Sequence, residues 1–254
     1  IVWSLGMLVL YAQGLMAGVN AALATGDGEP LVLDRADGYI GVMIDDLVTR
    51  GTQEPYRMFT SRAEYRLLLR SDNADQRLTP LGLAAGCVGT RRAGAFLEKM
   101  TAVTQAREIL ESHQATPHEC AAVGISVNTD GRRRTGMELL AYKDIDVTRL
   151  SALWPELGAM PDRVAAQMEI EAHYAGYLDR QHADIDAYRR DEALALPQTL
   201  DYDQVSGFSN EVREKLKIHR PATLGAAARI PGITPAALTI LLAHVRRTKR
   251  RAVA

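Results

Sequence analysis

The sequence is poor in cysteine, in aromatic residues and in net charge. Of its 254 residues, two are cysteines, Cys87 and Cys120, and 6% are aromatic. Two cysteines without paired spacing form neither a disulfide framework nor a zinc motif, and they point to a reducing cytosol. The formal net charge is −1, so any affinity for nucleic acid must come from local clustering of basic residues.

Long apolar runs and a glycine-rich phosphate-binding turn are also missing. The most apolar segment, residues 1–10, has about half the length that a membrane-spanning helix needs. A GxGxxG turn, which places a dinucleotide pyrophosphate at a helix N-terminus, has no counterpart here. We therefore expect no membrane partner, no firmly bound dinucleotide cofactor, no metal site and no catalytic residue in this chain.

Apolar residues recur mainly at helical spacing, which predicts a mainly α fold. The longest stripe begins at Pro161-Asp162 and continues for roughly 30 residues, and Thr116, Thr135, Ser209, Thr223 and Thr234 have the character of N-caps. A small-residue helix from Tyr11 should have Ala12, Leu15, Val19 and Ala22 or Leu23 on one face. The expected helices cover residues 38–48, 92–112, 135–140, 146–153, 210–217, 224–230 and a last one from 235, with a loop at 123–136. The long helix from 162 should end before Pro197.

The most unusual stretch is EPYRMFTSRAEYRLLLRSDNADQRLTPLG, Glu54 to Gly82, which contains five arginines and four carboxylates. Ser61 and Glu64 have the spacing of a capping box, which predicts a helix from about Arg62 with Arg62, Arg66 and Arg70 on one face. Guanidinium groups in such a row could bind phosphates, or Glu64, Asp72 and Asp75 could pair with them in a structural network. The charges alone do not decide between the two.

Two other charged features allow alternatives. Asp45-Asp46 could suggest a metal or a general base, but such a pair is more often a solvated edge or an arginine partner. The tail from Arg246 to Arg251 has five cations in six positions, which suits an RNA backbone or simply a soluble end.

The turn before Thr234-Pro235 is similar to a helix-hairpin-helix, which can hold phosphates.

The arginine-rich stretch resembles the most characteristic segment of the glucose-inhibited division protein A family, the tRNA uridine 5-carboxymethylaminomethyl modification enzymes (MnmG). The preceding GYIGVMIDDLVTRGT, Gly38 to Thr52, and the region from Leu200 to Leu242 also fit that family. The resemblance covers about residues 11–245, and it implies the C-terminal half of such an enzyme. Residues 1–10 depart from the family, which leads us to expect a truncated or rearranged N-terminus.

The resemblance implies a mainly α fold in three parts. Residues 1–82 would be the remnant of a flavin-domain end with its junction, residues 83–198 a helical domain with a long spine helix, and residues 199–254 a small C-terminal helical module with a basic tail. The candidate nucleic-acid-binding residues are Arg57, Arg62, Arg66, Arg70, Arg77, Arg246, Arg247, Lys249, Arg250 and Arg251.

The family's activity then sets the functional expectation. The full-length enzymes are cytoplasmic homodimers that use FAD and NADH to build an aminomethyl-type group on C5 of the wobble uridine of tRNA, and they act with a tRNA-modifying GTPase, MnmE. This chain would contribute tRNA and partner binding without firm cofactor binding of its own. The alternative is a non-catalytic helical module that binds nucleic acid or docks to a protein.

Overall fold

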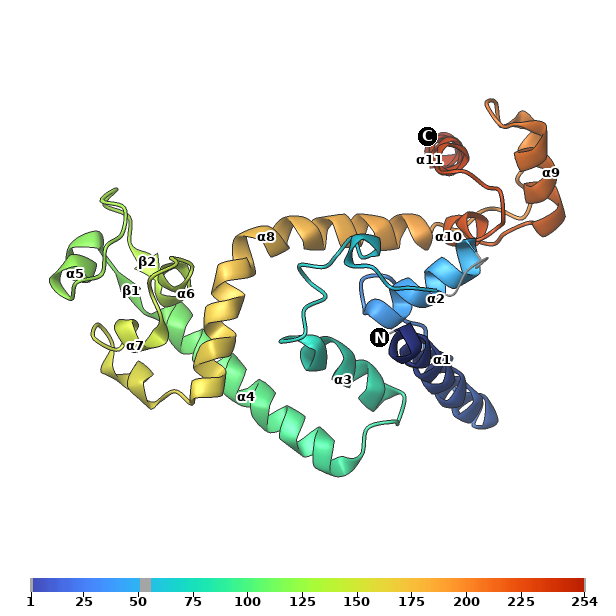
Figure 1. Ribbon diagram of the computed structural model, residues 1–254. Helices are drawn as coiled ribbons and strands as arrows, with labels where there is room; N and C mark the ends of the chain where they lie inside the picture. The colour runs from blue at the N-terminus through green and yellow to red at the C-terminus, as the bar shows by residue number, and fades with distance from the viewer. Residues whose placement is uncertain (1, 51–55, 254) are drawn as a thin grey trace. The chain divides into compact units, whose positions relative to one another are not determined.

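The structure is a computed structural model that describes residues 2–50 and 56–253, with side chains described for residues 9–48 and 56–247. The fold is mainly α, as the sequence predicts, and the chain forms two compact units (Figure 1). Unit 1 consists of residues 1–18, 32–65 and 182–254, and unit 2 of residues 19–31 and 66–181. Helices α1, Val2–Thr25, and α8, Asp162–Glu192, each have residues in both units.

Unit 2 is a set of helices with one short β-ladder. Its elements beyond α1 and α8 are α3 Ala74–Ala84, α4 Thr90–Ser112, β1 Gln114–Ala115, α5 Pro117–Ala122, β2 Arg134–Thr135, α6 Gly136–Leu140, α7 Val147–Leu150 and the 3₁₀ helix η2 Pro155–Ala159. The strands pair antiparallel, with Gln114 opposite Thr135. This ladder was not predicted, because two residues per strand are too few to show an alternating pattern.

Local capping sets where the short helices of unit 2 begin. The hydroxyl groups of Thr116 and Thr135 accept hydrogen bonds from the backbone N–H groups of Glu119 and Glu138 at 3.3 and 3.1 Å. The two glutamates accept in return from the threonine N–H groups, which completes a capping box at both α5 and α6. The predicted starts at these two threonines are therefore confirmed.

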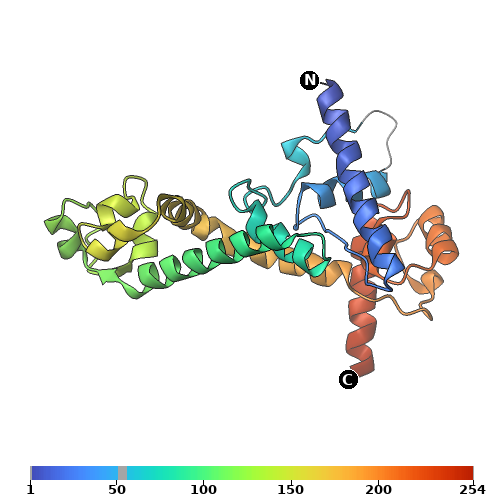
Figure 2. The ribbon, with the colours of Figure 1, turned by 90° about the horizontal axis from the view of Figure 1, so that it is seen from below.

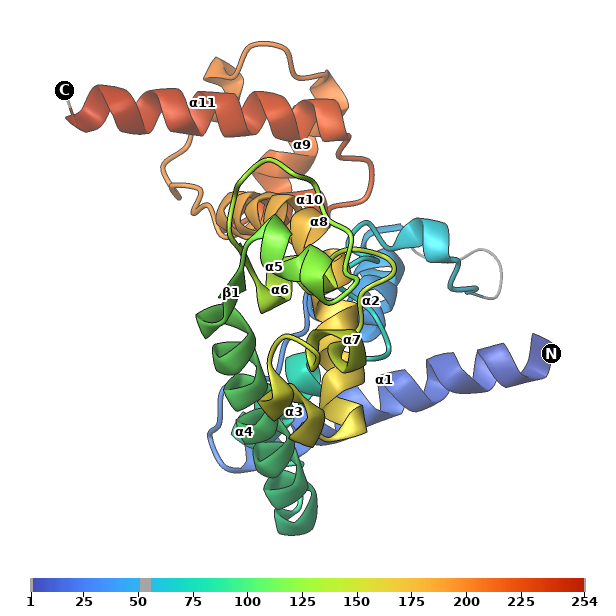
Figure 3. The same cartoon turned by 90° about the vertical axis from the view of Figure 1, so that its left-hand side faces the viewer.

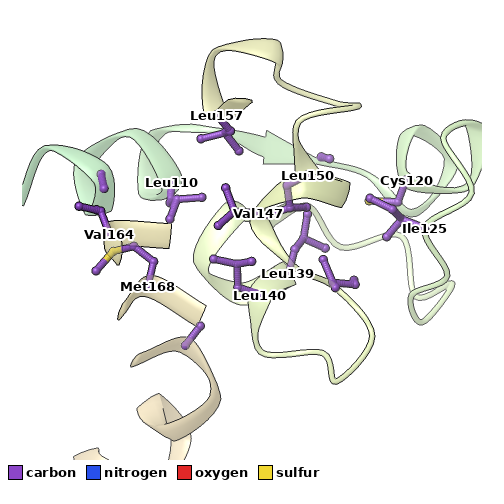
Figure 4. Packing of buried hydrophobic residues seen from close by; sticks show 14 of the residues in the cluster. Leu110, Cys120, Ile125, Leu139, Leu140, Val147, Leu150, Leu157, Val164 and Met168 are labelled. Atoms are coloured by element: carbon purple, nitrogen blue, oxygen red, sulfur yellow. The ribbon is translucent and has the colours of Figure 1, made fainter. Parts of the chain in front are cut away.

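The core of unit 2 lies where α4, α6, α7 and the start of α8 meet (Figure 4). Leu110, Leu139, Leu150 and Met168 are fully buried in it. The approach of α4 to α6 depends on Gly136, because a Cβ atom there would lie 2.8 Å from the carbonyl oxygen of Leu110. A side chain at this position would push the two helices apart.

Unit 1 combines an N-terminal part with a C-terminal helical bundle. Its elements are the first part of α1, α2 Tyr39–Arg50, the 3₁₀ helix η1 Thr60–Arg62, the end of α8, the 3₁₀ helix η3 Tyr202–Gln204, α9 Asn210–His219, α10 Leu224–Ala228 and α11 Pro235–Val253. Ser209, Thr223 and Thr234 accept hydrogen bonds from the first turns of α9, α10 and α11, as predicted. Leu216 of α9, Leu224 of α10 and Leu241 of α11 belong to one core. Figure 3 shows the three helices that carry them.

Two local features of unit 1 concern the packing of α1 and α2. In α1, Leu15 is 57% exposed, whereas its neighbour Met16 is buried. In α2, Gly41 lies so close to the preceding loop that a Cβ atom would be 1.9 Å from the carbonyl oxygen of Asp34. The loop before α2 therefore contacts the backbone of α2 directly, with no side chain between them.

The core of unit 2 gives a direct stability prediction. We expect Leu110→Ala to lower the free energy of unfolding by about 3 kcal/mol, because it removes buried methyl groups and leaves a cavity. Leu97→Ala on the same helix is the matched control, since Leu97 is 59% exposed, and it should cost less than about 0.5 kcal/mol. Urea denaturation followed by circular dichroism measures both, and similar losses for the two variants would contradict the assigned core.

Candidate nucleic-acid interface

The arginine-rich motif folds as a series of turns instead of the predicted helix. η1 ends at Arg62, and turns follow as far as Leu69 before α3 begins at Ala74. No side-chain hydrogen bond caps η1. The predicted helix and its row of guanidinium groups are therefore wrong. Glu54 and Pro55, at the start of the motif, lie outside the described residues.

Arg35 provides the physical reason for this difference. Its Nε and Nη2 donate to the carboxylate of Glu64 at 3.2 and 2.8 Å, and its Nη1 donates to Asp45 and Asp46 at 2.9 Å each. Nη2 also donates to the carbonyl oxygen of Arg62 at 2.8 Å. These contacts use all five N–H donors of the guanidinium group. Glu64 is held by Arg35 and cannot cap a helix.

Asp46 is the most buried acid in this network, with 1% of its side chain exposed. It accepts hydrogen bonds from Arg35, from the hydroxyl of Tyr56 at 2.9 Å and from Nη1 of Arg62 at 3.1 Å. Burial works to raise its pKa, but the hydrogen bonds from these three donors outweigh it and lower the pKa of Asp46. Burial and the contact with Asp46 raise the pKa of Tyr56 to about 12. The pair Asp45-Asp46 is thus an arginine partner.

Two further arginines of the motif have partners within unit 2. Nε of Arg70 donates to Asp72 at 3.0 Å, and its guanidinium group lies 4.3 Å from the ring centre of Tyr174. Arg77 donates to the side chain of Asn73 at 3.0 Å and to the carbonyl oxygen of Arg70. Of the acids that the structural alternative named, Asp72 pairs with Arg70, whereas Glu64 pairs with Arg35 and Asp75 with Lys99. Arg62, Arg70 and Arg77 therefore have internal partners, but not all of them are the predicted ones.

Arg57 and Arg66 are different, because both side chains are exposed. Within the part of the chain that the structure describes, neither lies within ion-pair distance of a carboxylate. The guanidinium group of Arg57 lies 5.0 Å from the ring centre of Phe59, which is itself 47% exposed. These two cations are accessible to a polyanion without first breaking an ion pair.

The basic tail is a continuation of α11 and not a separate extension. Arg246 is ion-paired with Asp191, while Arg247 is exposed. Lys249, Arg250 and Arg251 belong to α11, but their side chains lie outside the described residues.

A second set of ion pairs, which no sequence pattern predicted, joins the end of α8 to the segment before α2. Nε of Arg189 lies 2.6 Å from Asp34, and its Nη2 lies 2.7 Å from Asp37. Arg229 contacts Glu192 and also Asp45, the latter at 3.5 Å. Arg189 and Asp34, for example, are 155 residues apart, so no local spacing could have revealed these pairs.

Several acids of unit 1 are engaged by arginines. Burial works to raise the pKa values of Asp34 and Asp46, but hydrogen bonds from Arg189 and Arg35 help to outweigh it and lower them, so neither carboxylate readily accepts a proton. In the residues with described side chains, no group of three or more histidine, cysteine, aspartate or glutamate residues could hold a metal ion. Over the same residues, no helix has the length and apolar character required to cross a membrane.

Two family models match the chain. The first, described as the tRNA modifying enzyme MnmG/GidA C-terminal helical domain, matches residues 90–182. The second, described as the MnmG/GidA C-terminal helical bundle, matches residues 184–253. The chain belongs to the MnmG/GidA family. What it contains is the C-terminal helical region of MnmG/GidA.

Individual members of the MnmG/GidA family agree with this assignment. The curated tRNA uridine 5-carboxymethylaminomethyl modification enzyme MnmG of Syntrophotalea carbinolica is 49% identical over 237 residues, which are 93% of this chain and 38% of that protein. Two crystal structures of Aquifex aeolicus GidA, forms II and I, superpose with TM-scores of 0.70 and 0.69 at 36% and 35% identity. Each superposition covers 92% of this chain. It covers 37% of the GidA chain in form II and 36% of the GidA chain in form I.

The Arg35 network gives a second stability prediction. We expect Arg35→Met to lower the free energy of unfolding by about 3 kcal/mol, because it leaves Asp46 and Glu64 short of their main partner. Arg57→Met is the matched control and should cost less than about 0.5 kcal/mol, since Arg57 is exposed. Chemical denaturation measures both, and an Arg35→Met variant as stable as the wild type would contradict the network's role.

Asp46 also predicts how stability depends on pH. Because its pKa is lowered in the folded chain, its contribution is fully present above the unfolded value of about 3.9 and disappears as the pH falls through the folded value. The difference in unfolding free energy between wild type and Asp46→Asn should therefore be constant from about pH 5 to 7 and shrink below about pH 4. Denaturation at a series of pH values tests this, and a difference that grows on acidification would refute it.

Proposed function

We propose that this chain is the tRNA- and partner-binding portion of an enzyme that adds a (carboxymethyl)aminomethyl group to C5 of the wobble uridine of tRNA. The observation that carries the proposal is the 49% identity over 237 residues to a curated tRNA uridine 5-carboxymethylaminomethyl modification enzyme. The match to two models of an enzyme family does not favour the alternative of a free-standing module.

The redox cofactors, FAD and NADH, belong in this proposal to the full-length enzyme. The chain spans 38% of the curated relative and has no glycine-rich dinucleotide-binding turn. The chain then serves to hold RNA and to dock partners: the tRNA-modifying GTPase MnmE and a second copy of the enzyme. A cytoplasmic location follows from a tRNA substrate.

The RNA-facing cations are assigned from their accessibility. Arg57, Arg66 and Arg247 are exposed, so a phosphate can approach their guanidinium groups at little cost. Arg62, Arg70 and Arg77 act indirectly, because their contacts with Asp46, Asp72 and Asn73 fix the loops that carry the exposed residues. Lys249, Arg250 and Arg251 would extend the basic surface along the end of α11.

Binding of tRNA tests the proposal. We expect the chain to bind unmodified tRNA in a salt-dependent manner, and Arg57→Ala with Arg66→Ala to weaken binding about three- to tenfold. Loss of two phosphate contacts should also reduce the slope of log affinity against log salt by roughly 1.4 to 1.8. Fluorescence anisotropy over a salt series measures both quantities.

The matched control is Lys143→Ala with Arg180→Ala, which removes two exposed cations from unit 2. It should change affinity less than twofold. Failure of the wild-type chain to bind tRNA would overturn the proposed function, whereas equal losses in the two double variants would overturn only the assignment of Arg57 and Arg66.

A further inference from the structure

A cation-lined recess lies in unit 2, where Asp75 and Thr79 at the end of the arginine-rich motif face α4. It forms where α3 runs beside the first half of α4 and where α8 begins (Figures 1 and 2). We call it the α4 recess, and its volume is about 630 Å³. Ligand pockets in proteins commonly measure about 300–1,000 Å³, so this one can hold a group much larger than a single inorganic anion.

The charges around the α4 recess are predominantly positive. Arg92, Lys99 and Arg163 line it, against the single carboxylate of Asp75. Asp75 is engaged by Nζ of Lys99 at 2.6 Å. Arg92 and Arg163 are exposed, and within the part of the chain whose side chains are described neither has a carboxylate within ion-pair distance. Two guanidinium groups at the recess are thus available to an anionic ligand.

The walls between these cations are apolar. Phe96 and Ala102 are half-buried and Pro161 is exposed, so their apolar surfaces are accessible from the recess. An aromatic ring beside aliphatic side chains is a surface on which a flat, uncharged ring system can stack. A metal ion does not suit this composition, because the recess offers one carboxylate and no histidine or cysteine.

The positive surface continues beyond the recess to the start of α4. A second hollow of about 610 Å³ is lined by Gly89, Thr90 and Arg91, and it shares Arg92 and Ala95 with the α4 recess. Arg91 is exposed, and the first turn of α4 contains no acidic residue. A chain of phosphates leaving the recess would therefore pass further cations along α4.

We propose that the α4 recess binds one unstacked nucleotide of the RNA substrate. Its base lies against Phe96 and the neighbouring aliphatic side chains, its phosphates contact Arg92 and Arg163, and the adjoining nucleotide follows the hollow at Arg91. RNA suits the recess better than an acidic peptide does, because a nucleotide carries a stacking ring and a phosphate within one residue. This inference rests on the proposed function, since it names a site for the same tRNA.

The experiment compares three variants of the full chain in tRNA binding over a salt series. Arg92→Glu with Arg163→Glu should lower the affinity at least tenfold and reduce the slope of log affinity against log salt by about 1.4, the value for two phosphate contacts on single-stranded RNA. Phe96→Leu should lower the affinity about threefold or more without changing that slope, because it removes stacking and no charge.

The matched control is Lys143→Glu with Arg180→Glu, which makes the same change of charge at exposed positions of unit 2. It should weaken binding less than threefold. Circular dichroism and thermal unfolding of every variant check that the fold is intact. In a separate measurement, tRNA carrying 4-thiouridine should cross-link to residues 91–103 or 161–167.

The outcomes separate the two proposals. If the wild-type chain binds tRNA but the two charge-reversed variants lose affinity equally and cross-links fall elsewhere, the α4 recess is refuted while the proposed function stands. Unchanged tRNA binding in the variant Arg92→Glu with Arg163→Glu also refutes the proposed nucleotide site. The α4 recess would then be left for another ligand, such as an acidic peptide. If the wild-type chain does not bind tRNA, both proposals fail.

Discussion

The guanidinium group of Arg35 is the interaction on which unit 1 depends. Its five N–H donors reach Asp45 and Asp46 on α2, Glu64 beyond η1 and the carbonyl oxygen of Arg62. A buried cation is tolerated only when such donors are satisfied, and a lysine with three donors could not replace it. One side chain therefore ties three segments together and determines that the motif after residue 56 forms turns.

This arrangement changes the meaning of the arginine-rich motif. A row of guanidinium groups on a helix would be one uniform surface, but the structure divides the same residues into two classes. Arg62, Arg70 and Arg77 hold loops through internal partners, whereas Arg57 and Arg66 remain exposed. An abundance of arginine in a sequence is therefore compatible with few arginines that face a substrate, because carboxylate, amide and carbonyl groups nearby in space bind the others.

Much of the helical framework could be predicted from the sequence, because its signals are local. Thr116 and Thr135 cap the helices that follow them, and the long apolar stripe marks α8. The network around Arg35 could not be predicted in this way, because its partners are 10 to 29 residues away and follow no period. The capping signal at Ser61 and Glu64 failed for the same reason: a tertiary ion pair outweighed a local hydrogen bond.

Gly41 shows how the folding of α2 depends on its surroundings. A glycine inside a helix costs roughly 1 kcal/mol relative to alanine, yet the close approach of Asp34 leaves no space for any larger residue. Gly41 therefore lowers the intrinsic helix propensity of residues 39–50, and it does so at the position where the preceding loop contacts α2. A peptide of this sequence alone would be largely unstructured in water, so α2 and the loop before it acquire their conformations together.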